Sequence, residues 1–98
     1  MINLVEFGIP ELTDEQIEEA STAAENAART HILSKVTQKQ IESLNISIEA
    51  EGNKPVSFIV EIDLIFARGV KGLTEKSLAD EALKKAFNAI ENNLRRIR

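Results

Sequence analysis

The chain has 98 residues, of which 43% are hydrophobic, so it has the length and composition of one folded domain. It contains no cysteine, which excludes disulfides, thiolate metal sites and cysteine nucleophiles. The net charge of −4 is unevenly distributed: residues 1–52 carry ten acidic and three basic residues, whereas residues 53–98 carry six acidic and nine basic ones. The acidic half argues against nucleic-acid binding across the whole surface, and the basic half leaves room for a local phosphate contact.

No apolar run approaches the ~20 residues of a membrane-spanning helix, and the first ten residues lack the basic start and long apolar stretch of a secretory signal. We therefore expect a cytoplasmic protein without membrane contact. Residues 2–9 are largely apolar and are the candidate for a short extra N-terminal strand, which Gly8 and Pro10 interrupt.

The first helix is predicted over residues 14–35. Thr13 is a good N-cap, and Gln16 three residues later completes a capping box. Leu12 and Ile17 occupy the positions of a hydrophobic staple. The residues at helical spacing that share one apolar face are mostly alanines: Ile17, Ala20, Ala24, Ala27, Ala28, His31 and Ile32.

A β-hairpin follows, with strands over residues 44–50 and 56–67 and a turn at residues 52–55. Alternation assigns one set of side chains to the inner face: Leu44, Ile46, Ile48, Val56, Phe58, Val60, Ile62, Leu64 and Phe66. Ile59 and Ile65 fall on the other face beside Glu61 and Asp63, and we take these four as a candidate partner surface. The alternatives are that the N-terminal segment covers the two isoleucines, or that the face is solvated, since scattered exposed apolar residues are normal.

Glu49, Glu51, Glu61 and Asp63 are carboxylates on this outward face, where they could bind Mg²⁺ or act as an acid–base pair. Such chemistry requires a concave and partly dry site, which an open sheet face does not provide. Solvated charge is therefore the favoured interpretation, and we expect no metal site.

The loop after the hairpin contains Arg68, Gly69, Lys71 and Gly72, and it leads to Thr74, the predicted cap of a second helix. Its Gly-x-x-Gly spacing is similar to the loop with which KH domains clamp nucleic acid, although that loop joins two helices and this one joins a strand to a helix. A phosphate or RNA contact and a plain connecting loop both remain open. Arg95, Arg96 and Arg98 at the end of the second helix are the other candidate RNA contacts.

The second helix carries an apolar stripe wider than one sheet contact needs: Ala79, Ala82, Leu83, Ala86, Phe87, Ile90, Leu94 and Ile97. His31 is the only histidine and has no cysteine or second histidine to join it in a metal site, so we expect a helix-face residue at the edge of the core. No Walker loop, nucleophile elbow or metalloprotease motif is present. We expect no enzyme activity and no cofactor.

Two segments, Ala-Ala-Arg-Thr-His-Ile-Leu-Ser-Lys-Val at residues 27–36 and Ile-Glu-Ser-Leu-Asn-Ile at residues 41–46, resemble a small archaeal family of unknown function. The resemblance extends over most of the chain. It implies an archaeal cytoplasmic protein whose gene often lies near that of the prefoldin beta subunit, and it assigns no catalytic residues. The helix–strand–strand–helix order also resembles the small dimerisation subunit of the tRNA-modifying KEOPS complex.

These observations predict a single two-layer α+β domain spanning residues 1–98, in which an antiparallel hairpin packs against two helices. The expected function is that of a non-catalytic protein-interaction module, an accessory subunit of an archaeal complex or a self-associating protein. The alternative is an accessory protein that contacts RNA or tRNA through the glycine loop and the C-terminal arginines.

Overall fold

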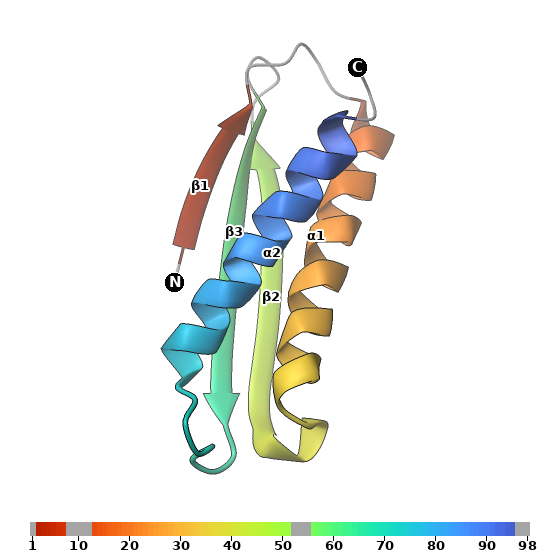
Figure 1. Cartoon of the computed structure of the whole chain (residues 1–98). Coiled ribbons are helices and arrows are strands. Elements are labelled where there is room, and N and C mark those ends of the chain that lie inside the picture. Colours follow the sequence, from red (N-terminus) through yellow and green to blue (C-terminus); the bar gives the residue numbers. More distant parts are fainter. Residues whose placement is uncertain (1, 8–12, 52–55, 96–98) are drawn as a thin grey trace.

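The computed structural model of the chain describes residues 2–7, 13–51 and 56–95. Its elements, in chain order, are β1 (Ile2–Phe7), α1 (Asp14–Lys35), a short 3₁₀ helix (Gln38–Gln40), β2 (Ile41–Glu51), β3 (Val56–Phe66) and α2 (Glu75–Arg95). The strands form one three-stranded sheet, and Figure 1 shows α1 and α2 on the same side of it. The predicted two-layer α+β fold is confirmed.

Helix α1 begins at the predicted cap. The Thr13 hydroxyl accepts a hydrogen bond from the Gln16 backbone N–H at 3.1 Å, and the Gln16 side-chain carbonyl accepts one from the Thr13 N–H at 2.8 Å. This reciprocal pair satisfies two donors that the first turn of a helix leaves unpaired. The helix ends at Lys35, as predicted. The proposed staple partner Leu12 lies outside the described residues.

The sheet has the order β1-β3-β2, so β3 is the central strand and is antiparallel to both neighbours. The apolar N-terminal segment therefore does form a strand, and it pairs with β3 on the side opposite β2. Strand β2 begins at Ile41, three residues before the predicted start. A register shift between Ile41 and Ser43 makes its first residues irregular. The predicted turn at residues 52–55 lies outside the described residues.

The core lies between the sheet and the two helices, which also pack against each other. Phe58, Val60, Ile62 and Leu64 of β3 are buried there, as alternation predicted. The buried residues of the helices include several alanines: Ala20, Ala24 and Ala28 of α1, and Ala79, Ala82 and Ala86 of α2. Small side chains let two helix backbones approach closely, so the predicted alanine face of α1 forms part of the helix–helix contact.

Three residues of the predicted α1 face lie at its margin. Ile17, Ala27 and His31 are only half-buried, whereas Ala28 and Ile32 are fully buried. The buried stripe of α1 is therefore narrower than its sequence suggested, because α2 covers one flank of the stripe and leaves a groove beyond it. Phe66 and Phe87 also pack against the core without being fully buried.

Candidate functional site

The face of the sheet that points away from the helices is formed in β2 and β3 by Ser43, Asn45, Ser47, Glu49, Glu51, Ser57, Ile59, Glu61, Asp63 and Ile65, and we call it the outer sheet face. Strand pairing places Glu49 beside Ile59 and Asn45 beside Asp63. Both described helices lie on the opposite side of the sheet (Figure 1). No described element covers this face.

The four residues predicted as a partner surface all lie on the outer sheet face. Ile65 is 47% exposed. Among the described residues, the exposed large hydrophobic ones are Leu33 and Ile65, and Ile65 is the more exposed of the two. Ile59 and Glu61 are half-buried, and Asp63 is exposed. Ile59 and Ile65 are six positions apart on one strand, or roughly 20 Å at the usual strand rise. They therefore flank an acidic centre and do not form one apolar patch.

The carboxylates Glu49, Glu51, Glu61 and Asp63 belong to one face, as the alternation predicted. Within residues 13–51 and 57–95, whose side chains the structure describes, no group of three or more acidic or histidine residues is placed to hold a metal ion. The ion pairs that form between described residues lie on the helices. The outer sheet face thus presents negative charge that no described cation neutralises.

The glycine loop folds as a turn. The Leu73 backbone N–H donates to the Val70 carbonyl at 3.2 Å, and Gly72 has a φ of +76°. A negative φ at Lys71 followed by a positive φ at Gly72 is the type II turn, in which glycine is the favoured third residue. This turn accounts for Gly72 without a ligand.

The helix start behind this turn is occupied by the chain itself. The Thr74 hydroxyl accepts a hydrogen bond from the Ser77 N–H at 3.1 Å. The carboxylate of Glu75 accepts one from the Phe66 N–H at 2.8 Å, which ties the helix start to the end of β3. A phosphate at this position would meet the negative charge of Glu75.

The structure does not gather the predicted RNA contacts into one patch. Arg68 and Lys71 lie before the first residue of α2, whereas Arg95 is its last residue. A helix of 21 residues spans about 30 Å, so the two basic groups lie at opposite ends of the domain. Arg95 is also paired with Glu91 one turn earlier. Arg96 and Arg98 lie outside the described residues.

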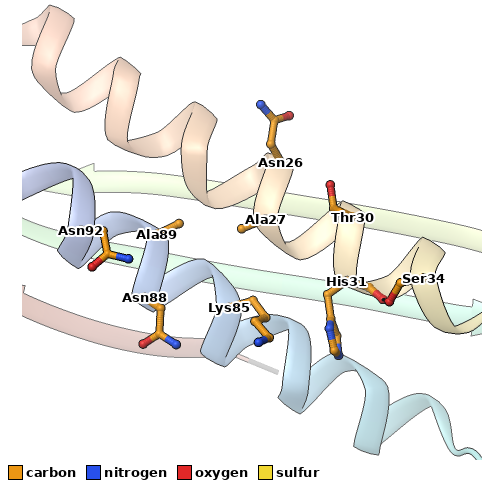
Figure 2. A pocket seen from close by; sticks show the side chains of 9 residues that line it. All are labelled: Asn26, Ala27, Thr30, His31, Ser34, Lys85, Asn88, Ala89 and Asn92. Atoms are coloured by element: carbon orange, nitrogen blue, oxygen red, sulfur yellow. Dashed lines mark hydrogen bonds between the residues drawn. The ribbon is translucent and has the colours of Figure 1, made fainter.

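A groove runs between α1 and α2, with a cavity volume of about 530 Å³. Figure 2 shows its lining side chains, which come from both helices: Asn26, Ala27, Thr30, His31, Ser34, Lys85, Asn88, Ala89 and Asn92. The His31 side chain is 14% exposed, and its Nε2 lies 2.8 Å from the Glu81 carboxylate of α2. The prediction placed His31 at the edge of the core, and no sequence pattern indicated its partner 50 residues away.

Neither described helix has the length and the unbroken apolar character that crossing a bilayer demands.

Comparison with known proteins gives relatives from archaea. An uncharacterized protein of Thermococcus kodakarensis is 30% identical over 94 residues, which cover 96% of this chain and 86% of the relative. One from Pyrococcus furiosus is 26% identical over 99% of this chain and 86% of its own length. Residues 9–93 match the model of a family described as "Protein of unknown function (DUF3194)".

Two solved structures share the fold. A crystal structure from Thermococcus onnurineus has a TM-score of 0.81 at 23% identity, over 99% of this chain and 93% of that one. The solution structure of a hypothetical protein from Methanothermobacter thermautotrophicus has a TM-score of 0.73 at 22% identity, over 94% of this chain and 99% of that one. At these identities the likeness establishes the fold, including its two helices.

Proposed function

The chain belongs to the DUF3194 family of archaeal proteins, and we propose that it is a non-catalytic protein-interaction module, an accessory subunit of an archaeal complex, that binds its partner through the outer sheet face. The observation that carries this proposal is the one-sided architecture. Both helices cover the inner face of a three-stranded sheet, and no described element covers the other.

The side chains of this face support a particular kind of partner. Ile65 exposes 47% of its surface at a strand position where a solvated sheet ordinarily carries a polar residue. Ile59, also on this face, provides a second apolar contact at the far end of the acidic centre. Apolar contacts within a charged surface are the usual composition of a protein–protein interface.

The negative charge of the outer sheet face determines the charge expected on the partner's binding surface. Glu49, Glu61 and Asp63 lie on adjacent strands, with Glu51 at the end of β2. A partner with lysine or arginine side chains between two apolar contacts would complement them, and complementary charge raises the association rate and selects the partner. RNA, a polyanion, would be repelled by this face.

The test begins by capturing proteins from an archaeal extract with the tagged chain and then reconstituting the complex from the purified partner. Binding is measured by calorimetric titration at low and high salt. We expect affinity to fall as salt rises, because exposed charge pairs are screened. The double substitution Glu61→Lys/Asp63→Lys should weaken binding by about tenfold or more, because it reverses the charge at the centre of the face.

The matched control is Glu18→Lys/Glu19→Lys, which changes the net charge equally on exposed positions of α1. Equal binding by the two double variants would contradict the proposal. Loss of the captured protein after nuclease treatment would also contradict it, since the link would then be a nucleic acid.

A further inference from the structure

Strand β2 has a free edge. It is hydrogen-bonded to β3 on one side, and no described strand lies on its other side. Figure 1 shows β2 as the outermost strand, opposite β1. Such an edge presents unpaired backbone N–H and C=O groups, and monomeric proteins usually block it with proline, lysine or an inward-pointing charge. Residues 43–51 contain no proline, no lysine and no inward-pointing charge.

Apolar surface remains accessible along the same edge. The inward-facing Leu44, Ile48 and Ala50 of β2 are half-buried, whereas Phe58 and Val60 of the neighbouring β3 are fully buried. Strand β2 packs mainly against α1 and has a strand on one side, whereas β3 packs against α2 and has a strand on either side. Ile46 in the middle of β2 is buried.

A small cavity at this edge, of about 200 Å³, extends the incompletely covered surface. It lies between α1 and β2 and is lined by Arg29, Leu33, Gln38, Ile41 and Leu44. Leu33, which is 37% exposed, belongs to it. The same side of the domain therefore has both unpaired backbone groups and incompletely buried apolar side chains.

We propose that a second copy of this chain occupies the edge, with the two β2 strands antiparallel about a two-fold axis at Ser47. The irregularity between Ile41 and Ser43 ends the regular part of the strand, which leaves residues 43–51 for pairing. Full overlap of these nine residues with their own copy places Ser47 opposite Ser47. The remaining pairs are Ile46 with Ile48, Asn45 with Glu49, Leu44 with Ala50, and Ser43 with Glu51.

This register gives favourable cross-strand pairs on both faces of the sheet. The inner-face pairs are apolar, Ile46 with Ile48 and Leu44 with Ala50, so they continue the core across the axis. On the outer face each glutamate meets a neutral partner, Asn45 or Ser43, that can donate a hydrogen bond.

Axes at Ile46 or Ile48 keep the same kinds of pairs but overlap fewer residues of the strand, and two other registers set unlike or like-charged residues together. A slip of one position would set apolar Leu44 against charged Glu49, because side chains of a strand alternate between faces. A slip that centred the axis on Glu49 would set that carboxylate against its own copy, and like charges directly opposite destabilise a sheet. The strand is thus self-complementary about Ser47, as a two-fold interface requires.

The resulting dimer has one six-stranded sheet with all four helices on the same side. Its outer sheet faces join into one continuous acidic surface. Self-pairing uses the edge of β2, whereas the partner contacts Ile59, Glu61, Asp63 and Ile65 lie on β3, so self-pairing does not depend on the partner proposed above and can be tested without it.

The first experiment uses single cysteines, since the chain has none of its own. Opposed residues of antiparallel strands have Cα atoms about 4.5–5.5 Å apart, which is within disulfide reach. With oxidised glutathione, Ser47→Cys should form a covalent dimer. Ser57→Cys should stay monomeric, because it substitutes the same residue type on the same face of the central strand. Equal cross-linking of both variants, or of neither, would overturn the proposal.

The second experiment measures solution mass by light scattering across a range of protein concentrations. The wild-type chain should approach twice its 10.9 kDa mass as concentration rises. Ser47→Lys should raise the dissociation constant about tenfold, because it sets two ammonium groups face to face on the axis. Ser57→Lys should leave it unchanged. A wild-type mass of one chain at every concentration, or equal effects of the two lysines, would overturn self-pairing.

Discussion

The two glycines of the loop after β3 provide a sharp test of what that loop does. Gly72 has a φ of +76°, a conformation that costs an L-residue with a side chain about 1–2 kcal/mol. Gly69 is not among the glycines with positive φ. A Cβ added at either position would meet nothing within 4 Å, so neither substitution causes a steric clash. The difference between them is therefore conformational.

We expect Gly72→Ala to lower the free energy of unfolding by about 1–2 kcal/mol, and Gly69→Ala to leave it unchanged or raise it by about 0.5 kcal/mol. The second effect arises because alanine restricts the unfolded chain. In a domain of this size, 1 kcal/mol shifts the melting temperature by about 4–8 °C.

Urea denaturation followed by circular dichroism measures both variants against the wild-type chain. If both glycines instead served to clamp a phosphate, the two alanine variants would change in stability alike, and both would lose RNA binding. A Gly72→Ala variant that is as stable as Gly69→Ala would refute the assignment of residues 70–73 as a type II turn.

Three further substitutions test other parts of the structure by the same denaturation assay. Thr13→Ala should cost about 1 kcal/mol through loss of the N-cap, whereas Thr22→Ala on the exposed middle of α1 should cost nothing; equal losses would contradict the capping role. Phe58→Ala should cost about 3–5 kcal/mol, because it leaves a cavity in the core, and a loss under 1 kcal/mol would mean that Phe58 is not packed as described. Glu81→Gln should cost less than about 1 kcal/mol, because its contact with His31 is partly exposed; a larger loss would show that this pair holds the helices together.

Local features of the fold could be predicted from the sequence because their causes are local. The capping box of α1 needs Thr13 and Gln16 alone, and both form the predicted hydrogen bonds. The alternation of β3 placed Phe58 and Val60 in the core and Ile65 on the outer sheet face. In each case the period of the backbone, and not a distant contact, determines where the side chain lies.

Features that depend on distant segments were harder to predict. A hairpin does not specify which of its strands receives a third strand, so the free edge of β2 follows from the pairing of β1 with β3. The contact of His31 with Glu81 joins residues 50 positions apart. The candidate RNA contacts of the glycine loop and of the C-terminal arginines are far apart because α2 extends between Lys71 and Arg95.

The central claim is that the outer sheet face binds a protein partner, and binding of the reconstituted partner to Ile65→Asp tests it most directly. Its control is Thr30→Asp, which adds the same charge to an exposed position on the helix layer. We predict that Ile65→Asp weakens binding by about tenfold or more while both variants keep wild-type stability. The partner would then bury a carboxylate at the position where it buries the isoleucine side chain in the wild-type complex. Unchanged affinity for Ile65→Asp, or an equal loss with Thr30→Asp, would contradict the claim.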